Sequence, residues 1–256
     1  MNFSLAIDDI LAEELCKFRV NQQCDIDMVE RTLHYYKGYP IFTKGYFDKY
    51  YTDKNIQRNL AQSNSSITWD SIETISKGTI YKVILSSQKN VNFPYISIYD
   101  DKVENNFTAT FMQNDNRQKA KEHLKALLEN AKCIFVYDLY LANNWASFLN
   151  FIQECFPRKQ LSILYPKEID SNTINTNPHI PKLTQEQCSE ITKIGGKSPN
   201  KNLWSFKVDN THQNFTNLHD RYLIIDNKIE IILTSGIDNL IDDSKDFTYI
   251  VRRHKQ

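Results

Sequence analysis

From residue 116 to the C-terminus, short apolar runs alternate with stretches whose apolar residues recur at helical spacing. The runs are typical of buried strands, and the stretches between them are typical of helices that cover a sheet; Thr184 with Gln187 could cap one of these helices. This alternation constrains the fold most, because helices that alternate with strands pack against a sheet in layers. The expected strands are 133–137, 161–164, 203–208, 222–225, 229–233 and 247–251.

The chain before residue 116 has a different pattern. Helical spacing dominates the first third of it, and a stretch rich in Tyr and Lys, 46–60, also predicts short helices. β-branched and aromatic residues then predict strands at 79–85, 95–99 and 107–111, which we expect to form a small antiparallel sheet. We therefore predict an α+β accessory domain over residues 1–115 and an α/β domain over residues 116–256.

Composition excludes several classes of protein. The chain has 31 basic and 31 acidic residues, so a whole-molecule field that gathers nucleic acid or anionic lipid is absent, although local patches are compatible with this balance. The five cysteines are widely spaced, which favours reduced core thiols over a disulfide or zinc framework. The sequence lacks a signal peptide and an apolar run near the ~20 residues of a membrane span. We expect a cytoplasmic protein without a membrane span.

One polar cluster interrupts the apolar runs. His219 and Arg221 stand at the start of one run, Asp226 ends it, and a turn of small residues, 234–236, follows the next run. At the period of a strand, His219 and Arg221 share one face. An imidazole can attack phosphorus or move a proton near neutral pH, and a guanidinium can hold two non-bridging phosphate oxygens. The pattern is typical of a phosphoester site, and the alternative is an ordinary β-hairpin with a surface His and Arg.

This segment resembles the H-x-K-x4-D signature of the phospholipase D superfamily, which is followed there by Gly-Ser and Asn. Here Ser235 and Asn239 stand at about those positions. The upstream run that ends in Asp138 and Tyr140 is also similar to the first strand of that family's domain. The resemblance covers residues 116–256 and implies a phospholipase D-like sheet flanked by helices.

The resemblance also implies a reaction that needs no metal ion and no other cofactor. His219 would attack phosphorus and form a phosphohistidine, and a second His219 across a two-fold axis would protonate the leaving group. Because the chain carries a single signature, the active form would be a homodimer. The other residues would hold the phosphate (Arg221, Ser235 and Asn239), orient the site (Asp226 and Asp138) or line it (Tyr140).

The signature departs from the family's pattern and leaves two functions open. Arg221 replaces the family's Lys, and the small-residue turn is shifted. Versions with His, Asp and Arg resemble both nuclease-like bacterial proteins, some near defence systems, and a eukaryotic phosphoinositide-binding domain without catalysis. We predict a metal-independent phosphodiesterase or nuclease, acting on nucleic acid or another phosphodiester in bacterial antiviral defence. The alternative is a catalytically inactive module that binds a phosphorylated ligand, nucleic acid or a partner protein, the last through residues 1–115.

Two further features carry weaker signals. The run 195–198, Gly-Gly-Lys-Ser, resembles the end of a phosphate-binding P-loop, but Pro199 follows where a helix should begin. His212 precedes His219 by seven residues, and it either lines the same cleft or is an ordinary loop histidine.

Overall fold

The computed structural model divides the chain into two compact units, Met1–Asn105 and Asn106–Gln256. The structure describes residues 3–19, 21–35, 40–43, 45, 71–89, 91–99, 107–173, 178–199, 201–212, 215 and 218–254. The short helices predicted for 46–60 lie outside these residues. No helix in the described part of the chain is both long enough and apolar enough to cross a membrane.

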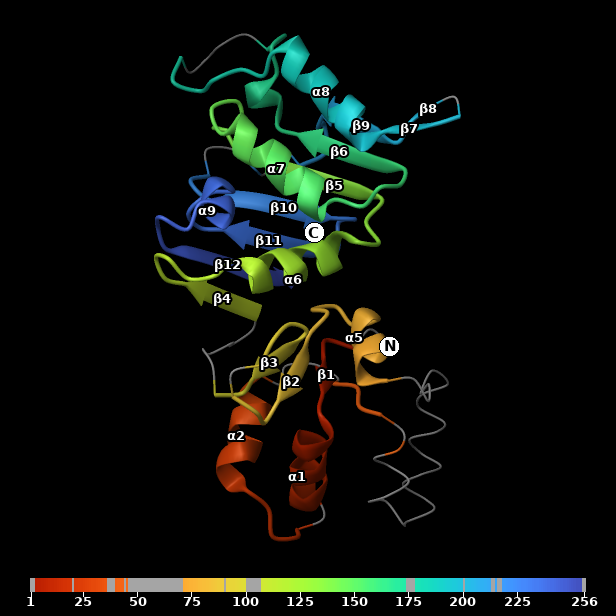
Figure 1. Ribbon diagram of the computed structural model, residues 1–256, viewed down its shortest axis with the longest axis vertical. Helices are drawn as coiled ribbons and strands as arrows, with labels where there is room; N and C mark the ends of the chain where they lie inside the picture. Colours follow the sequence, from red (N-terminus) through yellow and green to blue (C-terminus); the bar gives the residue numbers. More distant parts are fainter. Residues whose placement is uncertain are drawn as a thin grey trace. The chain divides into compact units, whose positions relative to one another are not determined.

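The first unit contains a small parallel sheet of order β1-β2-β3 (Figure 1). The antiparallel pairing predicted for this segment is wrong: β1 and β2 pair in parallel, as do β2 and β3. Every residue of β1 and β2 is buried, which is usual for parallel strands covered on both faces. The elements are β1 (Ala6–Ile7), β2 (Ile84–Ser86), β3 (Tyr95–Ser97), α1 (Asp9–Arg19), α2 (Ile26–Tyr35) and α5 (Ile72–Lys77).

The second unit is built on a mixed seven-stranded sheet of order β4-β12-β11-β10-β5-β6-β9. β5, β6 and β9 are parallel, and the other neighbours are antiparallel. This confirms the predicted α/β fold with a sheet flanked by helices. The strands are β4 (Phe107–Phe111), β5 (Cys133–Tyr137), β6 (Leu161–Tyr165), β9 (Trp204–Val208), β10 (Arg221–Ile225), β11 (Ile229–Leu233) and β12 (Phe247–Arg253).

β4 was expected to pair with strands of the first unit, and this prediction is wrong. β4 pairs with β12 along its whole length, with Phe107 beside Val251 and Phe111 beside Phe247. The Phe107 ring also meets the His123 ring of the following helix edge-on, with the centroids 4.7 Å apart. The partner of β4 lies at the far end of the chain, so the spacing of residues around β4 contains no signal for it.

Helices pack on one face of this sheet (Figure 1). The register of the strands places Phe107, Phe206 and Trp204 on the same face, because directly paired residues point the same way. Helix α6 contacts this face at Phe107, α7 at Phe206, and α8 at Trp204. The helices are α6 (Gln118–Leu128), α7 (Trp145–Cys155), the short 3-10 helix η1 (Lys167–Ile169), α8 (Gln185–Gly195) and α9 (Asp238–Ile241).

The opposite face is covered in part by the segment between β9 and β10. Phe135, Tyr137 and Ile224 form a buried cluster on this face, and Phe215 and Leu218 of the segment pack against it. The backbone N–H of Leu218 donates to the Tyr137 hydroxyl at 3.0 Å. The segment therefore crosses the sheet and is anchored there before it enters β10.

A two-stranded hairpin separates α8 from β9. It consists of β7 (Lys197–Ser198) and β8 (Lys201–Asn202), and Gly196 at its base has a φ of 82°, a conformation that glycine adopts without strain. A P-loop needs a helix directly after its Lys-Ser, and here Lys197 and Ser198 form β7 and a turn follows them. The run 195–198 is therefore the root of a hairpin.

Candidate functional site

One edge of the seven-stranded sheet collects most of the predicted site residues. β5 leads into Asp138 and β11 into Thr234, while β10 begins with Arg221. Because β10 is antiparallel to both neighbours, its first residue lies where β5 and β11 end. β6 and β9 are parallel to β5 and also end there. We call this the site edge.

Arg221 and Asp138 form a nearly buried ion pair at the site edge. Arg221 Nε lies 3.7 Å from Asp138 Oδ1, and the two side chains are 17% and 1% exposed. Asp138 Oδ1 accepts a hydrogen bond from the Tyr140 backbone N–H at 2.8 Å. Burial raises the pKa of Asp138, and the Tyr140 N–H and the charge of Arg221 counteract this only in part. Asp138 Oδ2 and Arg221 Nε are buried without a hydrogen-bond partner among the described residues.

Backbone and ring groups further fix the guanidinium of Arg221. Its Nη1 donates to the backbone carbonyl of His219 at 3.2 Å, and its Cζ lies 5.9 Å from the centroid of the Tyr140 ring. Gly236, with a φ of 97°, lets the turn after β11 come close, since a Cβ there would lie 2.3 Å from Asp238 Oδ1 and 3.6 Å from Arg221 Nε. Any larger residue at position 236 would collide with the Asp238 carboxylate and would be strained at this φ.

His219 lies in a bend immediately before β10 and is exposed. The sequence suggested that His219 and Arg221 share one face of a strand. The ladder between β10 and β11 begins only at Arg221, so strand alternation does not determine the direction of the His219 side chain. The imidazole makes no hydrogen bond with any residue that the structure describes. His219 and Arg221 are therefore neighbours through the backbone contact of the guanidinium.

Ser235 and Asn239 also lie at the site edge, but their side-chain donors are engaged. The Ser235 hydroxyl donates to the Asp246 carbonyl at 3.1 Å, and the buried Asn239 amide donates to the Ser235 carbonyl. These bonds brace the turn between β11 and α9. The predicted contact of both residues with a phosphate stays a prediction.

Asp226 is separated from the other predicted site residues. It follows the last residue of β10, so roughly 17 Å of strand separates it from Arg221 at about 3.4 Å per residue. Its Oδ1 accepts from the backbone N–H groups of Lys132 and Cys133, at 3.0 and 2.8 Å, where β5 begins. The structure thus gives Asp226 a role in the opposite edge of the sheet and does not bring it to His219.

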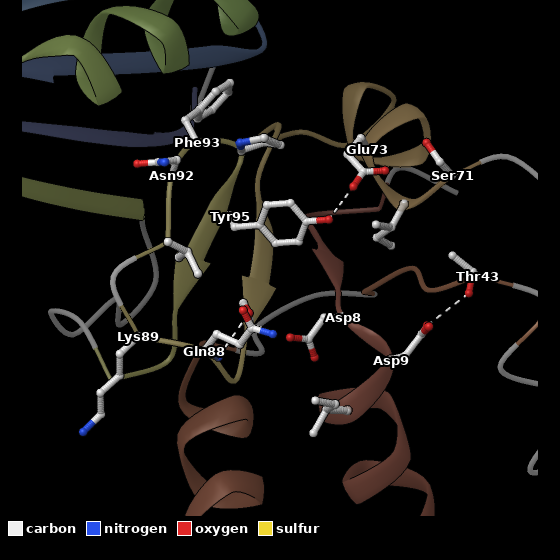
Figure 2. Close-up of a pocket in the computed structure, with 15 residues that line it drawn as sticks. Asp8, Asp9, Thr43, Ser71, Glu73, Gln88, Lys89, Asn92, Phe93 and Tyr95 are labelled. Atoms are coloured by element: carbon white, nitrogen blue, oxygen red, sulfur yellow. Dashed lines mark hydrogen bonds between the residues drawn. The ribbon is translucent and has the colours of Figure 1, made fainter.

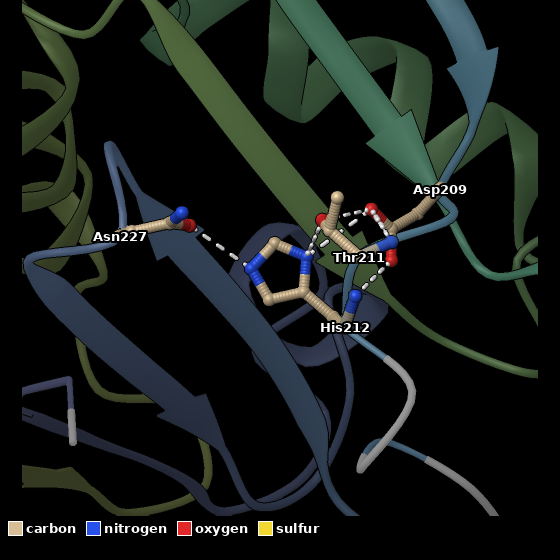
Figure 3. A network of polar contacts seen from close by, with 4 residues as sticks. All are labelled: Asp209, Thr211, His212 and Asn227. Carbon is tan, nitrogen blue, oxygen red and sulfur yellow. Dashed lines mark hydrogen bonds and ion pairs between the residues drawn. The ribbon is translucent and has the colours of Figure 1, made fainter. Parts of the chain in front are cut away.

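A polar clasp that the sequence did not predict holds the segment between β9 and β10 (Figure 3). Asp209 accepts from the backbone N–H of His212 at 2.7 Å and from the Thr211 hydroxyl at 2.7 Å. His212 Nε2 lies 3.0 Å from Asn227 Oδ1, and its ring stacks on Phe135 at 4.4 Å. Burial alone would raise the pKa of Asp209, but the bonds from Thr211 and His212 outweigh it and lower the pKa.

The clasp places His212 on the face of the sheet that carries Phe135. Arg221 points to the opposite face, the one covered by helices, so His212 does not line the same cleft. The turn residues Asp-Asn-Thr directly after a strand were an available signal for the clasp. A hollow of about 300 Å³ beside it is lined by Phe135, Pro166, Lys167, Glu168, Asp209, Asn210, His212 and Phe215.

The first unit has a larger pocket, of about 890 Å³ (Figure 2). Its acidic groups are bonded within the unit. Asp8 accepts from two backbone N–H groups at 2.9 Å, Asp9 accepts from the Thr43 hydroxyl, and Glu73 accepts from the Tyr95 hydroxyl. These three carboxylates therefore stabilise the fold of the first unit.

The described residues of the chain contain no group of three or more His, Cys, Asp or Glu side chains placed to hold a metal ion. The groups that the site edge offers are the exposed imidazole of His219 and the guanidinium–carboxylate pair of Arg221 and Asp138.

No protein-family model and no curated protein matches the chain. Among solved structures, the chain is similar to Nuc, a phospholipase D family member from Salmonella typhimurium, with 12% identity, a TM-score of 0.28, and 58% of this chain and 84% of Nuc covered. The chain is also similar to NucT from Helicobacter pylori, with 12% identity, a TM-score of 0.31, and 57% of this chain and 85% of NucT covered. A third similar structure is TrmBL2, an archaeal chromatin protein, with 10% identity, a TM-score of 0.26, and 84% of this chain and 64% of TrmBL2 covered. The structural similarity to Nuc, a phospholipase D family member, covers about 58% of this chain.

Proposed function

We propose that the chain is a metal-independent phosphodiesterase of the nuclease type, with His219 as its nucleophile. One observation carries this proposal: an exposed imidazole, without a hydrogen-bond partner among the described residues, stands next to a guanidinium that buried Asp138 holds in place. Such an imidazole is available to attack, and a fixed cation offsets the charge that develops on the phosphate oxygens.

The reaction has two steps. An imidazole nitrogen of His219 attacks phosphorus, a P–N bond forms, the P–O bond to one nucleoside breaks, and the departing oxygen takes a proton from a second imidazole. Water then attacks the phosphohistidine, the P–N bond breaks, and the proton released by water returns to the second imidazole. The products are a phosphate monoester and an alcohol, so the step needs no oxidant or other reactant.

We assign the second imidazole to a second copy of the chain. In the described part of the second unit, buried His123 bonds Tyr249, while His212 and His254 bond Asn227 and Glu230. The remaining histidine, His179, is exposed in the loop before α8, and the control variant below tests whether it takes part. A two-fold dimer with its site edges facing each other would bring two His219 side chains together. The defence role and the cytoplasmic location stay predictions.

The test uses the full chain in EDTA with DNA, RNA and bis(p-nitrophenyl) phosphate. We expect cleavage by the wild type and at least about 100-fold slower cleavage by His219→Ala, because nucleophile and proton carrier are lost together. His179→Ala, a substitution of another exposed histidine, is the matched control and should cleave normally. A wild type that cleaves none of these phosphodiesters would rule the enzyme out.

The second candidate is a phosphate-binding module without turnover. The charges near Arg221 favour it, because Asp138, Asp220 and Asp238 lie around the guanidinium, and a ligand with one phosphate group meets less repulsion from them than a long polyanion meets. Calorimetry with inorganic phosphate separates the two functions. Binding that Arg221→Ala abolishes and His219→Ala preserves, in a protein without turnover, would favour the module.

A further inference from the structure

The edge of the seven-stranded sheet opposite the site edge carries a row of cations. Each of them comes from the end of a different strand: Arg253 ends β12, Lys228 lies in the turn between β10 and β11, and Lys132 directly precedes β5. Lys159 precedes β6, and Lys201 in the hairpin precedes β9. We call these five residues the basic edge.

The basic edge is open to solvent and its charges are not neutralised. Lys132, Lys201, Lys228 and Arg253 are exposed and Lys159 is half-buried. None of the five forms an ion pair with a residue that the structure describes. Two further exposed cations, Arg158 and Lys197, flank the row beside Lys159 and Lys201. The charge here contrasts with the formal net charge of zero over the whole chain.

The carboxylates near the basic edge are few and mostly occupied. Asp226 accepts two backbone hydrogen bonds at the start of β5. Glu230 is buried and bonds Arg252 and His254. Glu129, at the end of α6, is exposed, and Glu154, in the last turn of α7, pairs with Lys121. Asp and Glu residues of this unit instead collect at the site edge, around Arg221 and α9: Asp138, Asp220, Asp238, Asp242, Asp243 and Asp246.

The strand order gives the row its length. From β12 to β9 the order is β12-β11-β10-β5-β6-β9. At about 4.8 Å between neighbouring strands, five such steps extend over about 24 Å, which equals about seven base pairs of B-form DNA at 3.4 Å per phosphate along one strand. Cations repeated along a line at this spacing suit a repeating anion better than a single phosphate group.

The hairpin at one end of the row is firmly rooted in the fold. Gly195 packs directly on the ring of buried Trp204, and Trp204 Nε1 donates to the Pro157 carbonyl at 2.9 Å. Arg158 lies over the same ring, with its Cζ 5.0 Å from the centroid. Figure 1 shows the β7–β8 hairpin projecting from the sheet on the side away from α9. The cations at this end therefore have a fixed base.

We infer that the basic edge binds the phosphodiester backbone of a nucleic acid, apart from the site at His219. The inference rests on the proposed function for its choice of partner. Roughly 17 Å of strand separates the two edges, so a small phosphodiester at His219 cannot also reach the basic edge, whereas a long nucleic acid can contact both. The basic edge would hold the polymer through its charge and would read no base sequence.

Binding is measured by fluorescence anisotropy on the full chain carrying His219→Ala, in EDTA, with a labelled DNA duplex of about 20 base pairs and salt from about 0.05 to 0.3 M. Single-stranded DNA and RNA of the same length identify the kind of backbone. The edge variant is Lys132→Gln/Lys201→Gln. The matched control is Lys125→Gln/Lys207→Gln, two exposed lysines that lie outside the row.

For duplex DNA, each lost phosphate contact reduces the slope of log affinity against log salt by about 0.9, so the edge variant should lose about 1.8 in slope and bind about 60-fold more weakly at 0.1 M salt. The control should bind like its parent. Equal behaviour of the edge variant and the control, or binding of phosphatidylserine vesicles in place of every nucleic acid, would overturn the inference.

Cleavage of bis(p-nitrophenyl) phosphate by the chain with an intact His219 separates this inference from the proposed function. If the edge variant loses DNA affinity and the chain does not cleave the small diester, the basic edge stands and the phosphodiesterase falls. If the diester is cleaved and the edge variant binds DNA like the control, the phosphodiesterase stands and the basic edge falls.

Discussion

Gly195→Ala tests the close contact between α8 and the sheet, on which the base of the hairpin depends. Gly195 is the last residue of α8, and Trp204 below it is fully buried. A Cβ at position 195 would lie 2.4 Å from Trp204 Cγ and 2.6 Å from both Cβ and Cδ2. These are the root atoms of the side chain, and the pairing of β9 with β6 fixes their backbone. The substitution must therefore move the ring or the end of the helix.

The size of the effect follows from these distances. Carbon atoms in contact lie about 3.5–4.0 Å apart, so about 1 Å of displacement is needed. Overpacking of this kind costs about 1–3 kcal/mol, and loss of the bond from Trp204 Nε1 to the Pro157 carbonyl adds about 1 kcal/mol. We expect the free energy of unfolding to fall by about 2–4 kcal/mol, a large part of the stability of a typical domain.

Urea denaturation followed by tryptophan fluorescence measures this loss, and near-UV circular dichroism should report the shifted Trp204 ring. Gly78→Ala is the matched control, since a Cβ there meets only the Ile75 carbonyl, at 3.3 Å, and the change should stay within about 0.5 kcal/mol. Whether Gly195→Ala lowers or raises the free energy of unfolding decides whether the close contact exists. An unobstructed Gly→Ala in a helix stabilises by about 0.5–1 kcal/mol, so a stabilised Gly195→Ala protein would refute the close contact.

Two further predictions concern the carboxylates of the sheet. Asp226→Ala should cost about 2–3 kcal/mol in urea denaturation, because two backbone N–H groups lose their acceptor and Ala takes a φ of 50°. Asp226→Asn should retain stability and turnover; lost turnover with retained stability would instead support the catalytic role predicted from the sequence. Burial raises the pKa of Asp138, so folding favours its protonated form, and this contribution to stability is lost as pH rises from about 4 through the folded-state pKa. The unfolding free energy of the wild type, relative to Asp138→Asn, should therefore fall over that range, and a rise would contradict the assigned cause.

Local features of the structure follow from the sequence because their partners are close in the chain. Thr184 and Gln187 form both bonds of the predicted capping box at the start of α8. The apolar runs of the second unit become strands within one or two residues of the predicted ends. In the first unit the strand predicted at 79–85 is wrong at its start, because β2 begins only at Ile84. The sequence also places an apolar run, Tyr222–Ile225, between Arg221 and Asp226, and such a run indicates that a strand separates the two residues. The family resemblance nevertheless led us to place Asp226 in the site.

Contacts between distant segments could not be read in the same way. The pairing of β4 with β12 and the contact of His212 with Asn227 join residues whose local sequence gives no sign of each other. The parallel sheet of the first unit is a further case, because a buried apolar run is compatible with either direction of pairing.

The sequence by itself determined that the second unit is an α/β layer structure, and that an imidazole and a guanidinium stand at the start of one of its strands. The tertiary structure decided what surrounds them. Arg221 meets buried Asp138, Asp226 moves to the opposite edge, and five cations from five separate segments form one row. The physical reason is that periodicity fixes which residues face a sheet, whereas strand order and direction decide which ends of those strands meet.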